Sequence, residues 1–370
     1  MSRDSVLRRV AVSWARSREL TPQRLWPALR ARGSVEALLA TAEDELAGML
    51  GSPSRARAAL SSRDDEAAER WAVEVERTGM RVVTAFDPEY PAPLVEIPDP
   101  PFLLFAQGNL ERLKSPAVAV VGSRDATRYG RDVASRLARE LSSVGVVVVS
   151  GFARGVDCAA HEAALESAGG TIAVLGCGLD VEYPREHARL KEAMRKRDLL
   201  LSEFAPGTEP RSSNFPVRNR IIAGLCSGVV VVEASRRSGS LITARLANDF
   251  GRDVFAVPGS VYSETSVGSH GLLRDGAILC RGAEDVLSEL FPTIGMAPVN
   301  APAAPTPPGD LSAEARKVFE ALTREEAAAA EELVEKTELP AATVLAALFE
   351  LEEAGLAVFS DGGRYGLVRR

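Results

Sequence analysis

The sequence lacks the features that would assign it to a membrane, disulfide-bonded or metal-binding class. No apolar run among its 370 residues reaches the ~18 residues that a bilayer-spanning helix needs. It has only four cysteines, which form no CxxC pair, and its three histidines have no metal-ligand spacing. The first residues, MSRDSVLRRVAVSWARSREL, lack the apolar core of a signal peptide. We therefore expect a cytoplasmic protein that binds no metal or other cofactor and does not insert into a membrane.

Familiar catalytic and nucleotide-binding motifs are also missing. There is no Walker A loop, no HExxH and no GxSxG. The segment GCGLDV (176–181) begins like a dinucleotide fingerprint, but Val181 stands where the third glycine belongs. We interpret His161 as a packing residue of a helix, and Ser240 as an N-cap or anion contact. These patterns indicate no catalytic residue.

Negative charge is absent from one window of an otherwise acidic chain. The formal net charge is −7, yet residues 210–232 contain no Asp or Glu. Three arginines, Arg211, Arg218 and Arg220, lie around Phe215 in this window. Because the chain as a whole is acidic, nucleic-acid binding cannot be argued from net charge and would need a local basic patch of this kind.

Runs rich in Val and Ile, separated by helical patterns, dominate the middle of the chain. Strands buried on both faces and alternating with helices are typical of a parallel α/β sheet. The predicted fold class is α/β, with a Rossmann-like, doubly wound, mostly parallel sheet. The expected strands occupy residues 116–122, 145–151, 171–176, 198–203, 228–234 and 252–259.

Smaller regions flank this sheet domain, which we place at residues 80–291. Residues 1–79 have apolar positions at helical spacing and a helix start at Ser34, so we expect a small all-α domain. Residues 292–309 hold six prolines and no charge, which is typical of a linker. Residues 310–370 show helices followed by two strands around a Gly-Gly turn, which favours a winged helix.

The winged-helix region lacks the positive charge that DNA binding requires. It carries 7 basic and 13 acidic residues, and no Lys or Arg occurs from Leu339 to Gly363. Phosphate neutralisation supplies most non-specific affinity for DNA, so we predict that this domain does not bind DNA. Four residues of its expected recognition helix, about 341–354, are spaced for a core face: Val344, Leu345, Leu348 and Leu351.

Several strand ends of the sheet domain are rich in glycine and serine. VGSR (121–124) closes one predicted strand, and RRSGSLITA (236–244) follows another. Glycine lets backbone N–H groups approach a ligand, and a helix N-terminus favours an anion. Because ligands bind outside the carboxyl ends of the strands of a doubly wound sheet, we expect phosphate groups at these turns.

The acid-free window adds cations and an aromatic ring to this edge. Pro216 suits the start of a helix that begins at Asn214 or Phe215, which puts Arg218 and Arg220 in its first turns. A cation there is unfavourable for the helix dipole unless an anion is bound nearby. Arginine contacts phosphate through two nitrogens, and an exposed Phe215 offers a base a stacking surface. The pattern fits single-stranded nucleic acid, and equally an alternative in which the arginines pair with distant acids across a domain interface.

Five segments in a fixed order carry a resemblance to a known family. They are VAVVGSRDATRYG, VVVSGFARGVDCAAHEAAL, TIAVLGCGLDVEYPREH, LLLSEFAPGTEP and FPVRNRIIAGLCSGVVVVEASRRSGSLITARLANDFGRDVFAVPG. Together they resemble the bacterial DNA-processing protein A family (DprA, also called Smf), over about residues 90–282. The resemblance implies that the chain is not an enzyme. It implies a protein that binds incoming single-stranded DNA during natural transformation, protects it and loads the recombinase RecA. Members often carry an N-terminal helical, SAM-like domain and a C-terminal winged helix.

The resemblance also assigns site residues. The DNA-contacting arginine of the family falls on Arg124, and its FPxRNR motif falls on residues 215–220. Arg211 lies where a basic residue helps in relatives, and VGSHG (267–271) departs from the family, in which asparagine is common near His270. With the glycine- and serine-rich strand ends, the predicted DNA site is Gly122, Ser123, Arg124, Arg211, Phe215, Arg218, Asn219, Arg220, Ser238, Gly239 and Ser240.

A homodimer is the expected assembly, because members of the family dimerise through the Rossmann-like domain. By resemblance the interface lies late in this domain. There the segment HGLLRDGAIL (270–279) offers Leu272, Leu273 and Ile278 as an apolar patch for an isologous contact.

Two rival functions remain open at this point. A nucleotide or phosphoribosyl hydrolase on the same fold would need a general acid/base at the strand ends, for which Glu203 and Glu233 are the candidates. A sequence-specific regulator would act through the C-terminal domain, and would bind single and double strands equally.

Overall fold

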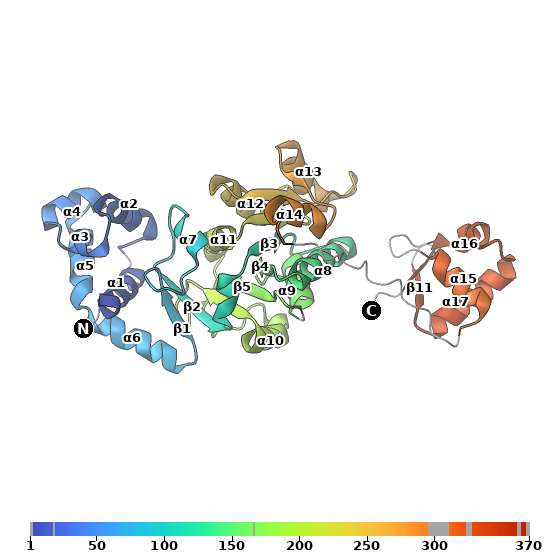
Figure 1. Ribbon diagram of the computed structural model, residues 1–370, viewed down its shortest axis with the longest axis horizontal. Coiled ribbons are helices and arrows are strands. Elements are labelled where there is room, and N and C mark those ends of the chain that lie inside the picture. Colours follow the sequence, from blue (N-terminus) through green and yellow to red (C-terminus); the bar gives the residue numbers. More distant parts are fainter. Residues whose placement is uncertain are drawn as a thin grey trace. The chain divides into compact units, whose positions relative to one another are not determined.

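A computed structural model of the protein describes residues 3–17, 19–165, 167–294, 311–322, 328–360 and 364–367. The chain divides into two compact units, Met1–Met296 and Ala297–Arg370. The predicted linker at 292–309 lies, from residue 295 onward, outside the described residues. Figure 1 shows the helices and strands of both units, coloured along the sequence.

A nine-stranded sheet forms the centre of the first unit. Its strands are β1 (Arg81–Thr84), β2 (Leu103–Gly108), β3 (Ala117–Val121), β4 (Val147–Ser150), β5 (Thr171–Leu175), β6 (Leu199–Ser202), β7 (Gly228–Val231), β8 (Asp253–Ala256) and β9 (Ile278–Leu279). They pair in the order β1-β2-β6-β5-β4-β3-β7-β8-β9. From β6 to β9 neighbours are parallel, whereas β1 and β2 are antiparallel at one edge. The six predicted strands and the mostly parallel sheet are confirmed, and β1, β2 and β9 are additional.

Alternate residues of the central strands face two different cores. In β3, Val121 packs into one core and Val120 into the other, and both are almost fully buried. This burial on both faces is why the strands are continuous apolar runs. The helices of the Val121 face include α7 (Ala92–Val95), α11 (Asn214–Leu225), α12 (Ser240–Asp249) and α13 (Val267–Arg274). Those of the opposite face include α8 (Arg128–Ser143), α9 (Val156–Ala164), α10 (Ala188–Arg197) and α14 (Ala283–Leu290).

The connections between strands reverse direction beside β3. From β3 the chain runs through α8, α9 and α10 to β4, β5 and β6 on one side. Helix α11 then returns it to β7, on the other side of β3, and α12 leads on to β8. The carboxyl ends of β3 and β7 therefore flank a topological switch point, which is where doubly wound sheets bind ligands.

The N-terminal region is helical, as predicted. Its helices are α1 (Arg3–Arg16), α2 (Pro22–Arg32), α3 (Val35–Leu39), α4 (Glu43–Leu50), α5 (Pro53–Ser61) and α6 (Glu66–Arg77). The hydroxyl of Ser34 accepts a hydrogen bond from Ala37 N–H at 3.1 Å, which confirms the predicted helix start. Trp14 and Trp26 pack in the core of these helices together with Phe102, which precedes β2. The helices therefore share apolar packing with the sheet and belong to the same compact unit.

The second unit is a winged helix with its own core. Its elements are α15 (Ala313–Ala321), β10 (Ala328–Ala329), α16 (Ala330–Thr337), α17 (Ala341–Glu353), β11 (Ala357–Ser360) and β12 (Arg364–Leu367). The strands form an antiparallel sheet in the order β10-β12-β11. The Gly-Gly turn expected between the last two strands, at residues 362 and 363, lies outside the described residues.

One apolar residue of α17 was predicted on the wrong face. Val344, Leu348 and Leu351 are fully buried, as expected, but Leu345 is 50% exposed. Leu345 lies about 100° from Val344 and about 60° from Leu348 around the helix, which puts it at the outer edge of the buried stripe. It lies one turn from Phe349, which is 62% exposed, and the outward face of this helix is therefore apolar.

Candidate nucleic-acid interface

A cleft of about 610 Å³ opens at the carboxyl edge of the sheet, beside the switch point. It is lined by the turns after β3 and β7 and by the first turns of α11. Nine of the eleven residues predicted for the DNA site line it: Gly122, Ser123, Arg124, Phe215, Arg218, Asn219, Ser238, Gly239 and Ser240. Arg211 and Arg220 do not. The tertiary structure thus gathers most of the predicted site at one place.

Arg124 and Phe215 form a wall of this cleft. Arg124 is exposed, and the central carbon of its guanidinium lies 5.0 Å from the centre of the Phe215 ring. Helix α11 begins at Asn214, as predicted, which puts Phe215 in its first turn. The ring is half-buried because it rests on Gly176, where a Cβ would lie 2.8 Å from Phe215 Cδ1. The face of a ring held in this way can attract a cation or stack on a base.

A second cleft, of about 830 Å³, shares Arg124, Phe215 and Tyr183 with the first. The rest of its lining comes from the turns that follow β4 and β5 and from Glu209 and Pro210 after β6, and it includes the carboxylates of Glu182 and Glu186. The Tyr183 ring is 36% exposed and lies 5.8 Å from Phe215, with 33° between the ring planes. It offers a second aromatic face beside the first. Tyr183 is not among the predicted residues, and its signal in the sequence is an aromatic residue shortly after the glycine-rich end of β5.

Arg218 lies under the cleft rather than on its surface. Its side chain is 4% exposed. Nη1 donates to the carbonyl of Gly151 at 2.6 Å and to that of Val174, and Nε donates to Asn219 Oδ1 at 3.2 Å. Burial lowers the pKa of Arg218 to about 10, against the opposing influence of Asp157. Because much of its donor capacity is used by the ends of β4 and β5, the geometry favours a structural role over the direct phosphate contact inferred from the sequence.

Asp157 completes this buried arrangement. Its Oδ2 accepts hydrogen bonds from the N–H groups of Gly151 at 3.1 Å and Ala153 at 3.2 Å. Burial raises the pKa of Asp157, and Arg218 opposes that shift. If Gly151 carried a Cβ, that atom would lie 2.7 Å from both Arg218 Nη2 and Asp157 Oδ2. Both charged side chains therefore approach this glycine closely. Together they hold a turn in which Phe152 has a φ of 59°, which is uncommon for a residue other than glycine.

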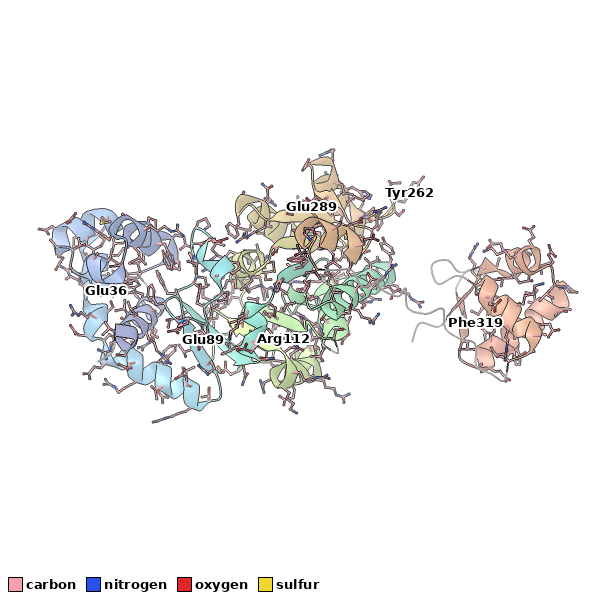
Figure 2. The ribbon with its side chains drawn as sticks, in the orientation of Figure 1. Glu36, Glu89, Arg112, Tyr262, Glu289 and Phe319 are labelled. Atoms are coloured by element: carbon pink, nitrogen blue, oxygen red, sulfur yellow. The ribbon has the colours of Figure 1, made fainter. Side chains whose placement is uncertain are left out.

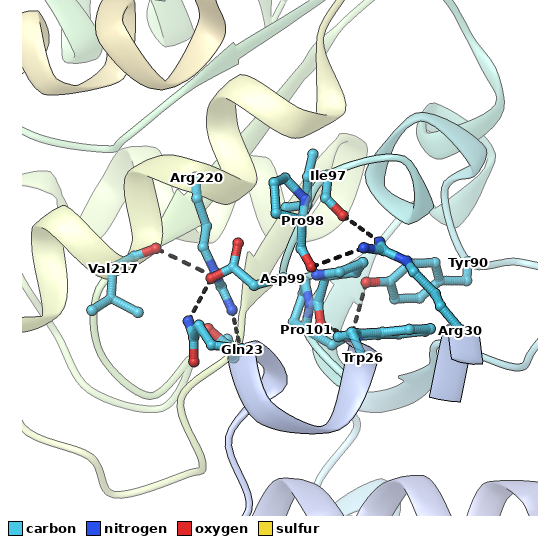
Figure 3. Close-up of polar contacts among 12 residues, drawn as sticks. Gln23, Trp26, Arg30, Tyr90, Ile97, Pro98, Asp99, Pro101, Val217 and Arg220 are labelled. Carbon is cyan, nitrogen blue, oxygen red and sulfur yellow. Dashed lines mark hydrogen bonds and ion pairs between the residues drawn. The ribbon is translucent and has the colours of Figure 1, made fainter. Parts of the chain in front are cut away.

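Arg220 pairs with acidic residues that are distant in the sequence, which is the alternative to DNA contact that the sequence left open. It is 5% exposed; Nε donates to Asp99 Oδ2 at 3.1 Å and Nη2 to Glu203 Oε1 at 2.7 Å. Burial alone would lower the pKa of Arg220, but the two carboxylates raise it above its usual value. Asp99 lies 121 residues away in the sequence, in the segment that faces the N-terminal helices (Figure 3). Arg220 is therefore a buried ion-pair partner and lies outside both clefts.

Exposed cations surround the first cleft. Arg211 precedes α11 and is exposed, and Arg236 and Arg237 are exposed in the turn after β7. In that turn Ser238 Oγ accepts from the N–H of Ser240 at 3.3 Å at the start of α12. Arg236 and Arg237 are not among the predicted residues, although they adjoin the predicted Ser238–Ser240 turn. These side chains supply the local positive charge that the net charge of the chain does not.

The carboxylates proposed for a hydrolase are engaged in other contacts. Glu203 is paired with Arg220, and buried Glu233 accepts from Thr127 N–H at 2.9 Å, Thr127 Oγ1 at 2.6 Å and Thr265 Oγ1 at 3.2 Å. His161 is fully buried beside Thr171, and burial lowers its pKa to about 3, which supports a packing role. Among the described residues, no cluster of His, Cys, Asp or Glu could hold a metal ion, and no helix could span a membrane.

The residues expected at a dimer contact are only partly outward-facing. Leu272 packs against the core on the α11 face, and Ile278 packs against the core on the opposite face. Leu273 is half-buried. His270 lies in the VGSHG segment that departs from the family pattern. Its Nε2 is 3.1 Å from the carbonyl oxygen of Gly259, and this contact links α13 to the loop after β8.

Two family models match the chain. Residues 81–291 match the model described as DNA recombination-mediator protein A, and residues 302–363 match the DprA winged helix domain. The DNA processing protein DprA of Streptococcus pneumoniae is 52% identical over 200 residues, which are 54% of this chain and 71% of that protein. Protein Smf of Escherichia coli is 40% identical over 302 residues, which are 80% of this chain and 79% of that protein.

Two solved structures of DprA proteins resemble this chain. The X-ray structure of DprA from Streptococcus pneumoniae superposes with a TM-score of 0.66 at 40% identity, over 76% of this chain and 96% of that one. The structure of DprA from Helicobacter pylori, which describes a single-stranded DNA binding mode, gives a TM-score of 0.52 at 31% identity. It covers 57% of this chain and 96% of that one.

Proposed function

Because the chain belongs to the DNA recombination-mediator protein A family, we propose that it binds single-stranded DNA at the clefts walled by Arg124 and Phe215. In this role it protects incoming DNA, loads RecA onto it during natural transformation, and catalyses no reaction. The observation that carries the proposal is the exposed Arg124 guanidinium over the half-exposed Phe215 ring at the switch point of the sheet.

Different groups at the carboxyl edge of the sheet suit the phosphates and the bases of a single strand. Arg124 and Arg211 supply positive charge for phosphates, and the turn at Ser238–Ser240 lies at the N-terminus of α12, where the helix dipole favours an anion. Phe215 and Tyr183 offer faces on which bases stack. Because Arg124 already lies over Phe215, a base that stacks on this ring has to displace the guanidinium or sandwich against it. A duplex keeps its bases stacked on one another, so the site favours a single strand.

Titration of labelled oligonucleotides tests this function. The protein should bind a single strand more tightly than the duplex of the same sequence. Arg124→Gln should weaken single-strand binding and reduce the slope of log affinity against log salt by about 0.7, the contribution of one phosphate contact. Arg70→Gln, which alters an exposed arginine of α6 outside both clefts, is the control and should change neither. Equal affinity for single and double strands, or an unaltered slope in Arg124→Gln, would contradict the site.

RecA loading and the hydrolase rival need assays of their own. On single strands coated with a single-strand-binding protein, the chain should shorten the lag before RecA filaments form. A hydrolase is disfavoured because Glu203 and Glu233 are both engaged. Nucleotide turnover that disappears in Glu203→Gln would nevertheless favour the hydrolase.

A homodimer through the late part of the sheet domain completes the proposal. In the loop after β8, Val261 is 79% and Tyr262 95% exposed, and Tyr262 projects from the surface (Figure 2). Exposed apolar groups beside α13 favour an isologous contact. Leu273→Arg should give monomers in analytical ultracentrifugation and weaken single-strand binding through lost avidity. A dimer that persists in this variant would argue against α13 as the interface.

The winged helix is proposed to take no part in DNA binding. The outward face of α17 presents Leu345 and Phe349 where a recognition helix would need cations. Residues 310–370, expressed alone, should bind neither single-stranded nor duplex DNA at about 50 mM salt, where electrostatic binding is strong. Residues 1–300 should keep the affinity of the full chain. Binding of the isolated domain at micromolar concentration would show that the prediction is wrong.

A further inference from the structure

Residues 92–101 lie between the N-terminal helices and α11. On the side of the N-terminal helices, α2 holds the segment through its backbone carbonyls (Figure 3). Trp26 Nε1 donates to Pro100 O at 2.7 Å, and Arg30 Nη2 donates to Ile97 O at 2.9 Å. The Trp26 ring also stacks on Phe102, with 5.1 Å between ring centres and 13° between planes. The segment therefore follows any movement of α2.

On its other side, the same segment packs against α11 with almost no free space. A Cβ on Gly224 of α11 would lie 2.8 Å from Ile97 Cγ2 and 2.9 Å from Leu94 Cδ1. Close-packed interiors transmit displacement rather than absorb it. A shift of the segment is therefore passed on to α11, the helix that carries Phe215.

Asp99 provides the polar link between the two sides. Its Oδ2 accepts from Gln23 Nε2 of α2 at 2.5 Å and from Arg220 Nε of α11 at 3.1 Å (Figure 3). The side chains of Arg220 and Asp99 are 6% and 16% exposed, so this charge-assisted contact is largely shielded from water. One carboxylate oxygen thus connects the N-terminal helices to the helix of the candidate DNA site.

We infer that Gln23, Asp99 and Arg220 are positioning residues for DNA binding, and that the N-terminal helices tune the affinity of the site without touching DNA. The inference rests on the proposed function. Arg220 follows Phe215 by five residues on α11, so a tilt of this helix moves the Phe215 ring relative to Gly176 and Arg124. The ring has little tolerance for such a shift, because even a Cβ on Gly176 would lie 2.8 Å from it.

Positioning and simple electrostatics predict opposite results for Asp99→Asn. Loss of a carboxylate from a DNA-binding domain should by itself strengthen binding, because a charge that repels phosphates is removed. Loss of positioning should instead weaken single-strand binding by about two- to thirtyfold, the usual size of effect at a coupled residue that touches no ligand. The slope of log affinity against log salt should stay unchanged, since no phosphate contact is removed. Gln23→Ala should weaken binding in the same direction.

A matched control and a structural readout accompany these variants. Asp285 of α14 pairs with Arg281 at 2.6 Å and its side chain is 16% exposed, so it matches Asp99 in exposure and in having an arginine partner, but it lies outside the segment. Asp285→Asn should not weaken single-strand binding. In the absence of DNA, Asp99→Asn should speed hydrogen exchange in the first turns of α11 but not in β3. Gln23 is exposed, so Gln23→Ala should fold normally and can test the inference even if Asp99→Asn folds poorly.

The outcomes separate this inference from the proposed function. Failure of the unaltered protein to bind single-stranded DNA would overturn the function itself. Affinity that is lost in Arg124→Gln, yet unchanged or increased in Asp99→Asn and Gln23→Ala, would overturn the positioning role alone. Weakened binding with a reduced salt slope in Arg220→Gln would instead make Arg220 a phosphate contact and also contradict the inference.

Discussion

Replacing Arg218 by methionine should lower the free energy of unfolding by about 2–5 kcal/mol, because two buried carbonyls lose their donor at about 1–3 kcal/mol each and Asp157 loses the charge that opposes its burial. Methionine occupies a similar volume but leaves Asp157 buried without its cation. The carbonyls of Gly151 and Val174 lose their donor as well. Urea-induced unfolding followed by circular dichroism at pH 7 measures the change. The large effect follows from burial, because Arg218 is 4% exposed.

Arg124→Met is the matched control for this prediction. Arg124 is exposed, so its replacement should change the free energy of unfolding by no more than about 0.5 kcal/mol while it weakens single-strand binding. Adding Asp157→Asn to Arg218→Met should recover part of the lost stability, because the unpaired charge is then gone. An Arg218→Met protein of normal stability that fails to bind DNA would restore the direct phosphate contact inferred from the sequence.

Phe215→Ala should weaken single-strand binding by about 1–3 kcal/mol, the value for loss of one base–aromatic stack. This corresponds to a change of roughly 5- to 150-fold in affinity. The reason is geometric: the ring is seated on Gly176 with its face toward Arg124, so alanine removes one of the two aromatic faces that both clefts share and leaves Tyr183. Fluorescence titration with a labelled oligonucleotide measures the loss, and Phe215→Tyr should keep most of the affinity.

Phe349→Ala is the control for the aromatic substitution. Phe349 is 62% exposed on α17, in the other compact unit, so its removal should leave single-strand affinity unchanged. Because Phe215 is half-buried, the stability of Phe215→Ala must be measured beside its affinity. Unchanged affinity in a folded Phe215→Ala protein would remove base stacking from the proposed site.

The sheet could be predicted from the sequence because of how its strands are buried. Parallel strands covered on both faces must be apolar throughout, so all six expected runs form strands. β9 contains only two residues, too few to show a pattern of its own, and β1 and β2 form the antiparallel edge of the sheet. They form where neighbouring strands offer free N–H and C=O groups, which is decided by the tertiary structure.

The candidate site was likewise predicted in part from the sequence. The sequence alone determined that glycine-rich turns and an arginine-bearing, acid-free helix meet at the carboxyl edge of the sheet, and nine of eleven expected residues line one cleft. It could not distinguish Arg218 from Arg220. The two are about 200° apart around α11 and so point to opposite sides.

Only the tertiary structure decided what each of these arginines does. A buried guanidinium is tolerated only where the fold supplies partners that offset its desolvation, and those partners come from remote segments. Gly151, Val174 and Asp157 surround Arg218, whereas Asp99 and Glu203 pair with Arg220. Arg124, without buried partners, stays at the surface. Local sequence thus determined which cations reach this edge, and long-range packing determined which of them remain available to a ligand.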